Sequence, residues 1–213
     1  MSKLQTLTYN HETRLAAEGF RLVAGLDEAG MGPWAGPVVA GAVILPLGCE
    51  LPLINDSKKL TEKRRDEAAA AIKELAVAWA VGEVPPDEVD RINPRAASSV
   101  AMQRAIEALG VQPDFLLVDA FGVRGCPIPQ RGIIRGDAEV ISIAAASILA
   151  KTHRDAAMVE FSRQYPGYGF EKHKGYGTAV HSKALGELGP CPIHRLSYAP
   201  VRKALQQKEK SPV

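Results

Sequence analysis

The chain has 213 residues, 46% of them hydrophobic, and a formal net charge of +2. This length fits one domain with a real hydrophobic core, and the near-balanced charge means that a nucleic-acid partner requires the basic residues to gather on one face. Because the chain has no long charge-free apolar segment and no apolar N-terminal signal, we expect a cytoplasmic protein with no membrane partner.

The first part of the chain predicts a short helix and two strands. The helix falls within residues 1–20. An apolar strand over residues 21–28 ends in two adjacent carboxylates, and residues 36–45 form a second strand whose near-continuous apolar character indicates burial on both faces. The short link of residues 29–35 favours an antiparallel hairpin.

The middle of the chain alternates helices and strands. Thr61 can cap a helix that runs to about residue 74. Residues 77–81 alternate large apolar side chains with small ones, which is the period of a strand. After a Pro-Pro break, Asn93 and Pro94 supply the cap and the first-turn proline of another helix, which ends at Gly110.

A compact apolar strand over residues 115–119 ends in an acid, and ligands of open α/β sheets gather beyond such carboxyl ends. Residues 121–132 form a loop rich in glycine and proline, and residues 133–135 form a last short strand. Gly136 opens a long helix that ends near residue 165. The run of alanine and serine in this helix predicts close packing against the sheet.

The C-terminal part differs in amino-acid composition from the rest of the chain. Residues 165–178 mix basic, aromatic and glycine residues, which is typical of segments that stack on sugars or bases and touch phosphates. A helix through Leu185 and a short one near residues 200–208 complete the chain.

Four acids stand at the ends of predicted elements: Asp27, Glu28, Asp119 and Asp137. Each alone is typical of a helix cap or a surface residue. Together in one pocket they would repel one another and would not all ionise without cations. Two divalent ions about 3.5–4 Å apart would relieve that repulsion and stabilise both the entering and the leaving oxygen of a phosphoryl displacement. Oxygen-only ligands favour Mg²⁺ or Mn²⁺ over zinc.

The adjacent acids raise a geometric conflict. Neighbouring residues of a regular strand point to opposite faces of the sheet. Asp27 and Glu28 can therefore share a metal site only if the strand ends or bulges between them.

Other polar and aromatic residues allow two interpretations each. The glycine-rich loop of residues 30–36 is a hairpin loop or a polyanion-reading turn. It is not a dinucleotide loop, because Pro33 lacks an N–H and no helix follows. Lys58 is a solvated loop cation or a phosphate contact. Tyr176, between two glycines, is a half-buried tyrosine or a stacking ring. His173 and His181 are too widely spaced in the sequence to predict a metal pair.

The ordered motifs of the chain resemble those of ribonuclease HII. The match runs from about residue 20 to residue 200, and the ordered set is far more specific than any single motif. The matching segments are Gly25–Gly30, Gly32–Pro33, Ala35–Val39, Asn55–Leu60, Leu117–Asp119, Gly136–Asp137, Ser142–Lys151, His173–Thr178 and His194–Ser197.

The resemblance implies a fold and an activity. The fold is the α/β ribonuclease H-like fold, a five-stranded mixed sheet flanked by helices with a small C-terminal helical part. Residues 1–213 then form a single domain, with the sheet-and-helix core over about residues 20–165 and a substrate-contacting part over about residues 166–213. The implied enzyme is a monomeric endoribonuclease that cleaves the RNA strand of RNA–DNA hybrids. It also incises 5′ of single ribonucleotides in duplex DNA, leaving 3′-hydroxyl and 5′-phosphate ends, for ribonucleotide and primer removal.

The resemblance also assigns roles to individual residues. The four acids would hold two Mg²⁺ or Mn²⁺ ions and carry catalysis. The turn of Gly30, Met31 and Gly32 would read the ribose 2′-hydroxyl, the group that distinguishes RNA from DNA. Tyr176 would stack on the sugar after the ribonucleotide, and Lys58 would hold a phosphate.

One position departs from the family pattern. Met31 stands where the family usually has arginine, whose forked donors suit phosphate. Substrate binding is then weaker, or another cation such as Lys59 or Arg124 takes over the contact. Two rival functions follow: a catalytically weakened module that binds hybrids, and a related nuclease that acts on DNA junctions. The presence of all four acids argues against the first.

Overall fold

The computed structural model describes residues 7–51, 54 and 60–209, which form a mixed five-stranded sheet in the order β3-β2-β1-β4-β5. Strand β2 pairs antiparallel with β1 and β3, whereas β4 pairs parallel with β1 and β5. The hairpin predicted for the first two strands is confirmed. The strands are β1 (Val23–Ala29), β2 (Val38–Ile44), β3 (Ala78–Val84), β4 (Phe115–Asp119) and β5 (Gln130–Ile133).

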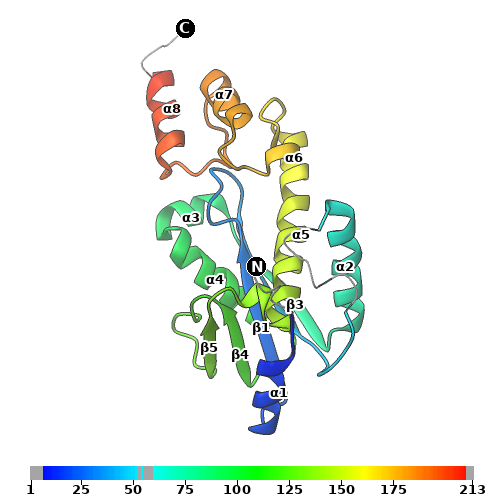
Figure 1. Cartoon of the computed structure of the whole chain (residues 1–213). Coiled ribbons are helices and arrows are strands. Elements are labelled where there is room, and N and C mark those ends of the chain that lie inside the picture. Colours follow the sequence, from blue (N-terminus) through cyan, green and yellow to red (C-terminus); the bar gives the residue numbers. More distant parts are fainter. Residues whose placement is uncertain (1–6, 52–53, 55–59, 210–213) are drawn as a thin grey trace, which may run out of the picture.

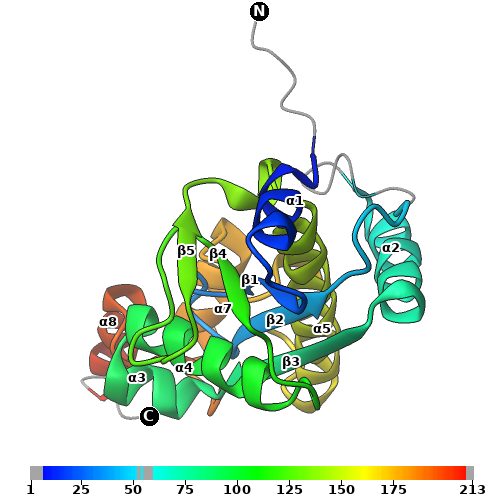
Figure 2. The same ribbon diagram turned by 90° about the horizontal axis from the view of Figure 1, so that it is seen from below.

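Helices cover both faces of this sheet (Figure 2). One face packs against α3 (Pro86–Ile92) and α4 (Pro94–Glu107). The other face packs against α1 (Asn10–Ala17), α2 (Glu62–Leu75) and α5 (Ile141–Gln164). Apolar side chains of the strands fill both layers, as the continuous apolar run of β2 predicts. Among the described helices, none is both long and apolar enough to cross a membrane.

The C-terminal helices lie beyond one end of α5 (Figure 1). They are α6 (Phe170–His173), α7 (Ala179–Leu188) and α8 (Ala199–Glu209). A separate buried cluster that includes Met158 of α5, Tyr168 and Phe170 joins this part to the core.

Two glycines let α5 approach the centre of the sheet. A Cβ on Gly25 of β1 would lie 2.2 Å from the backbone carbon of Ser142, and one on Gly41 of β2 would lie 2.3 Å from the carbonyl oxygen of Ala146. Both distances are shorter than any van der Waals contact. The alanine and serine run of α5 therefore packs backbone to backbone on β1 and β2, as predicted.

The element boundaries differ from the prediction at several places. Strand β5 begins three residues before the predicted Ile133, and α5 begins at Ile141 rather than at Gly136. Residues Gly136–Ala138 form a separate 3₁₀ turn, η2, because Glu139 and Val140 leave the helical region with φ of −124° and −112°. The sequence reading also missed two short helices, α3 after the Pro-Pro break and α6 within residues 165–178.

Replacement of Gly41 tests the close approach of α5. Gly41→Ala forces the Ala146 backbone to move, and overpacking of this kind lowers the free energy of unfolding by about 1–3 kcal/mol. The control is Gly186→Ala in α7, where a Cβ meets no atom within 4 Å, so that alanine leaves stability unchanged or raises it by about 1 kcal/mol. Urea unfolding of both variants measures the difference, and a Gly41→Ala protein as stable as wild type contradicts the packing described.

Candidate active site

The four predicted acids converge at one end of the sheet. Because β1 and β4 are parallel and Leu26 pairs with Val118, Asp27 and Asp119 follow at the same carboxyl edge. Glu28 is next in β1, and Asp137 lies in η2 between β5 and α5. The Gly136 N–H donates to Asp119 Oδ1 at 2.7 Å, which ties η2 to the end of β4.

Asp27 and Glu28 face helices on opposite sides of the sheet. The Ser147 hydroxyl of α5 bonds to Asp27, whereas the Ser98 hydroxyl of α4 donates to Glu28 Oε2 at 3.1 Å. A shared metal site was expected to need a strand end or a bulge between the two acids. Pairing of β1 with β2 continues regularly to Ala29, so this described strand has neither on that side. Pairing with β4, however, stops at Leu26, so both acids lie at an open edge on that side.

The acids share one electrostatic environment. Burial raises the pKa of Asp27 well above its usual range, and the charges of Glu28 and Asp119 raise it further, whereas the Ser147 hydrogen bond lowers it. Burial also raises the pKa of Glu28, with contributions from Asp119 and Asp137. Each additional negative charge is therefore unfavourable here, and a divalent cation would relieve the repulsion.

The donor set fits a hard divalent ion, because every candidate ligand is a carboxylate oxygen. The carboxylates do not form a complete metal-binding site, however. Within residues 7–51, 54 and 60–209, no group of three or more His, Cys, Asp or Glu side chains is arranged to hold a metal ion.

Two cavities adjoin the acids and share Glu28. The first, the Tyr176 cavity, has a volume of about 380 Å³. Its polar and aromatic lining is Glu28, Arg65, Asp137, Ser147, Lys151 and Tyr176. The second, the Met31 cavity, has a volume of about 320 Å³. Its lining includes Glu28, Met31, Arg95, Asp119, Phe121 and Arg124. Glu28 therefore borders both cavities, whereas Asp137 borders only the first and Asp119 only the second.

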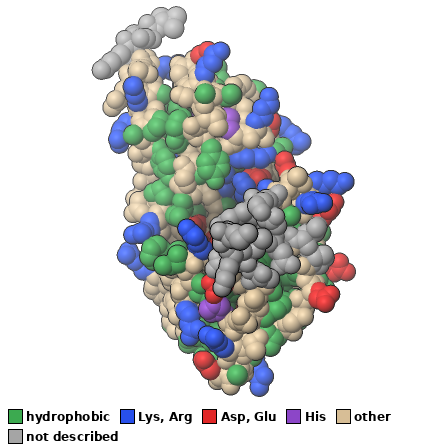
Figure 3. Space-filling view, viewed as in Figure 1, with side chains coloured by type: hydrophobic (Ala, Val, Ile, Leu, Met, Phe, Trp, Pro, Cys, Tyr) green, Lys and Arg blue, Asp and Glu red, His purple; other side chains and the backbone are tan. Residues whose placement is uncertain are grey.

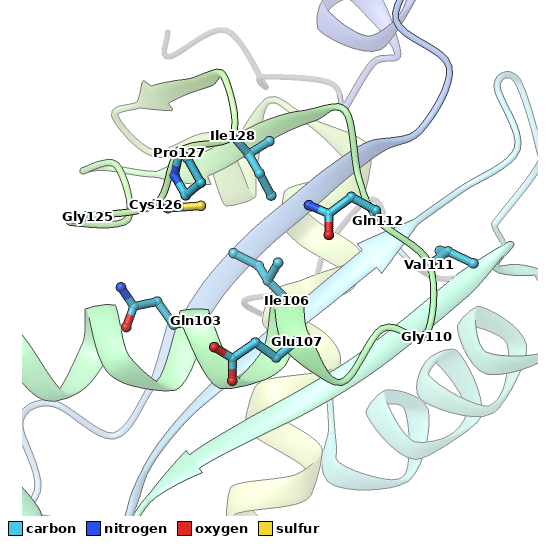
Figure 4. A pocket seen from close by; sticks show the side chains of 10 residues that line it. All are labelled: Gln103, Ile106, Glu107, Gly110, Val111, Gln112, Gly125, Cys126, Pro127 and Ile128. Atoms are coloured by element: carbon cyan, nitrogen blue, oxygen red, sulfur yellow. The ribbon is translucent and has the colours of Figure 1, made fainter.

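A larger cavity elsewhere contains none of these acids. It has a volume of about 560 Å³ and lies between the C-terminal part of α4 and residues 125–128 (Figure 4). Glu107 is the one acidic side chain in its lining. Chemistry rather than cavity size thus identifies the candidate active site.

Arg195, which follows His194 in the chain, fixes the glycine-rich turn through hydrogen bonds to its backbone. Its side chain is fully buried. It donates to the carbonyls of Gly36 at 2.7 and 3.0 Å, of Pro33 at 2.9 Å and of Met31 at 3.2 Å. The Tyr198 hydroxyl also donates to the Met31 carbonyl. The turn is therefore fixed through its backbone oxygens.

A second buried arginine, Arg154 of α5, holds the other end of the turn. It donates to the carbonyls of Ala35, Pro37 and Lys174, each at 3.0 Å. Burial and the neighbouring Arg195 charge lower the pKa of Arg154 to about 10, so it stays charged at neutral pH. The sequence reading assigned no role to either arginine, because nothing in a charged residue's sequence position reveals burial.

Tyr176 faces the turn from across the first cavity. Its side chain is 45% exposed, and a Cβ on Gly32 would lie 4.0 Å from Tyr176 Cε1. The ammonium of Lys151 lies 5.8 Å from the ring centroid. The guanidinium of Arg154 lies 5.9 Å from the same centroid. Asp155 accepts from Lys151 at 2.7 Å and from Arg65, which lines the same cavity, at 3.0 Å.

Buried histidines lie next to the backbone of Tyr176, where they stack and form hydrogen bonds with one another. The His173 and His181 rings stack with centroids 4.4 Å apart. Burial lowers the pKa of His181 and of His194 to about 4, so both are neutral. Their tautomers follow: Cys191 N–H donates to His194 Nδ1, His194 Nε2–H to His181 Nε2, and His181 Nδ1–H to the Tyr176 carbonyl.

The remaining predicted residues have mixed outcomes. Lys58 and Lys59 lie outside the described residues. Arg124 lines the Met31 cavity, which agrees with its expected role as a replacement for the family arginine at position 31. Arg95 lines the same cavity, but no role was predicted for it from the sequence. On the face shown in Figure 3, basic side chains are spread out and interspersed with acidic ones rather than gathered in one patch.

The strand order, the mixed pairing and the flanking helices define a ribonuclease H-like fold. Ribonuclease H2 of Pyrococcus horikoshii OT3 has a TM-score of 0.75 at 24% identity, over 90% of this chain and 100% of that one. Bst-RNase HIII in complex with Mn²⁺ has a TM-score of 0.71 at 19% identity, over 98% of this chain and 72% of that one. These identities establish the fold.

Sequence similarity establishes the family. The model for the family Ribonuclease HII matches residues 24–201. Ribonuclease HII of Myxococcus xanthus is 55% identical over 202 residues, covering 94% of this chain and 69% of its own length. Ribonuclease HII of Geobacter sulfurreducens is 50% identical over 201 residues, covering 94% and 93%. The chain belongs to the ribonuclease HII family, whose members are metal-dependent endonucleolytic ribonucleases H that act on RNA–DNA hybrids.

Proposed function

We propose that this protein, besides cleaving the RNA strand of hybrids, incises duplex DNA on the 5′ side of single embedded ribonucleotides. The products are a 3′-hydroxyl end and a 5′-phosphate on the ribonucleotide. The protein acts as a monomer in ribonucleotide and primer removal. The observation that carries the proposal is the fixed orientation of the turn beside the acids.

The Met31–Gly32 peptide supports recognition of a ribose. The Met31 carbonyl points inward to Arg195 and Tyr198. In a planar trans peptide the N–H points opposite to the carbonyl, so the Gly32 N–H points away from the buried guanidinium. Gly32 also faces Tyr176 with room for a Cβ. A fixed donor beside an exposed ring suits a 2′-hydroxyl and the neighbouring sugar.

The acids support metal-assisted hydrolysis. Asp27, Glu28, Asp119 and Asp137 would hold Mg²⁺ or Mn²⁺, two ions during catalysis. When bound, such ions activate water and stabilise charge on the reacting phosphate. Ser147 and Ser98 orient Asp27 and Glu28 through their hydroxyls.

Cations of the Tyr176 cavity complement the acids. Asp155 fixes Lys151 and Arg65 in place, and both would contact phosphate oxygens of the bound strand.

One assay separates this proposal from its two rivals. Duplexes with one ribonucleotide, with none, and with an unpaired DNA junction are incubated with and without Mg²⁺ or Mn²⁺. We expect metal-dependent incision of the first duplex alone. Binding without incision would support the weakened module, and incision of the all-deoxy junction would support the junction nuclease.

Removal of one carboxylate tests the catalytic role. We expect Asp27→Asn or Asp119→Asn to lower kcat by about a hundred- to a thousandfold, because each removes charge that binds the ions. Asp27→Asn should leave the melting temperature unchanged or higher. The pKa of Asp27 is raised on folding, so its ionised form is destabilising at neutral pH. Glu107→Gln, in the distant cavity of Figure 4, is the control. Turnover like wild type in either acid variant contradicts the assignment.

Restoring the family residue tests the Met31 departure. We expect Met31→Arg to bind the ribonucleotide duplex more tightly and to steepen the dependence of log K on log salt by about 0.9, the value for one added phosphate contact. Binding is measured by anisotropy without divalent metal over a range of salt concentrations. An unchanged slope would show that position 31 does not reach a phosphate.

Tyr198→Phe tests the role of the turn in discriminating ribose from deoxyribose. This change removes one donor to the Met31 carbonyl and keeps the ring. We expect the preference for the ribonucleotide duplex over the all-deoxy duplex to fall about fivefold, the effect of one hydrogen bond. Tyr168→Phe is the matched control, because its hydroxyl bonds to the Gly189 carbonyl outside the turn. If both variants lower the preference equally, the effect is one of stability and not of positioning.

A further inference from the structure

The Met31 cavity contains groups that the proposed function leaves without a role. Its lining includes Arg95 of α4, together with Phe121 and Arg124 of the loop between β4 and β5. Phe121 is 70% exposed, and the guanidinium carbon of Arg95 lies 5.0 Å from the centroid of its ring. An arginine held over an exposed aromatic ring places positive charge on an apolar surface.

This loop is anchored, so the exposure of Phe121 does not come from a loose backbone. The Arg124 N–H donates to Ser99 Oγ at 2.9 Å, and Gln103 Nε2 donates to the Arg124 carbonyl at 2.7 Å. Gln130 of β5 bonds to both the N–H and the carbonyl of Val123, at 2.6 and 3.0 Å. The loop is thus fastened to α4 and to β5 on either side of the cavity.

The residue before Phe121 adds a conformational constraint. Ala120 has φ of +57°, a left-handed conformation that costs free energy for a residue with a Cβ. Hydrogen bonds from the Ala120 N–H to Ile133 and from the Phe121 N–H to the Asp119 carbonyl, at 2.9 and 2.8 Å, hold it there. The strained backbone turns the chain sharply after Asp119 and places Phe121 at the cavity.

We propose that Arg95, Phe121 and Arg124 form a second strand-binding subsite, which takes the deoxynucleotides on the 5′ side of the cleaved phosphodiester. The ring and the guanidinium of Arg95 stack on a base or sugar, and the two arginines contact phosphates. This inference rests on the proposed function.

The direction of the strand follows from the two cavities. Glu28 lines both of them, so a strand that crosses the acids enters through one cavity and leaves through the other. The proposed function places the sugar after the ribonucleotide, its 3′ neighbour, at Tyr176. The continuous strand then brings its 5′ flank to Arg95 and Phe121.

Met31 is consistent with such a subsite. Its side chain gives the cavity an apolar wall with no hydrogen-bond donor, although the usual arginine of the family would supply positive charge there. Arg95 and Arg124, which line the same cavity, supply that charge instead.

The test compares two duplexes with one ribonucleotide each. One has a long 5′ flank, and in the other the cleaved strand begins at the nucleotide before the ribonucleotide. On the duplex with the long flank, we expect the double variant Arg95→Gln, Arg124→Gln to raise KM at least tenfold. The slope of log K against log salt should become shallower by about 0.9 for each phosphate contact that is lost. Phe121→Ala weakens binding about five- to a hundredfold, the range for loss of one stacked base. For the short flank, the ratio of variant to wild type approaches one.

The control is Arg131→Gln, which removes an arginine that also lies over a phenylalanine ring, 6.0 Å from the centroid of Phe115, but outside the cavity. It should match wild type on both duplexes. Equal effects of the subsite variants on both duplexes, or no effect on the long one, overturn the subsite. If the effect of the variants depends on the length of the 3′ flank instead, the proposed strand direction is wrong. Incision of the ribonucleotide duplex by the wild-type protein is measured separately. If the wild-type protein does not incise it, the proposed function and this inference are both wrong. If the wild-type protein incises it and the subsite variants behave like wild type, only this inference is wrong.

Discussion

The hydrogen bonds from two buried guanidinium groups to the carbonyls of residues 31–37 are the interaction on which the site depends. A buried charge is costly unless polar groups solvate it, and here backbone oxygens supply that solvation for Arg154 and Arg195. Each guanidinium is planar with donors in fixed directions, so it also sets the orientation of the peptides that it binds. The turn is consequently held open toward Tyr176, and the β1–β2 hairpin is joined to the C-terminal helical part.

Cationic side chains line the cavity beside the acids of the active site. The raised pKa values of Asp27 and Glu28 show that negative charge is unfavourable at the end of the sheet before any cation binds. Two guanidinium groups lie behind the turn, and Lys151 and Arg65 line the Tyr176 cavity. A polyanion that approaches the acids therefore meets positive charge at short range. A protein with a net charge of only +2 and no concentrated basic patch on the face in Figure 3 can thus still bind nucleic acid.

Much of this architecture could be predicted from the sequence, because its signals are local. Thr61 and Asn93 cap their helices through side-chain oxygens as expected, and Asp119 ends its strand at the predicted residue. What could not be predicted depends on long-range partners. The carbonyl partners of Arg195 lie about 160 positions earlier in the chain, and those of Arg154 in the hairpin nearly 120 positions earlier. Asp27 and Glu28 both lie at an open edge because the pairing of β1 with β4 stops at Leu26. The alternation of residue types does not encode where this pairing stops.

The departure at Met31 can be interpreted in these terms. The structure separates two properties of the turn: its backbone orientation, set by bonds to the Met31 carbonyl, and its side-chain charge. Substitution at this position changes the charge but leaves the clamped carbonyl in place. A loss of arginine should therefore alter affinity for the phosphate backbone more than discrimination between ribose and deoxyribose. Retention of the four acids and of their serine partners agrees with this view, since a protein that only bound hybrids would need neither.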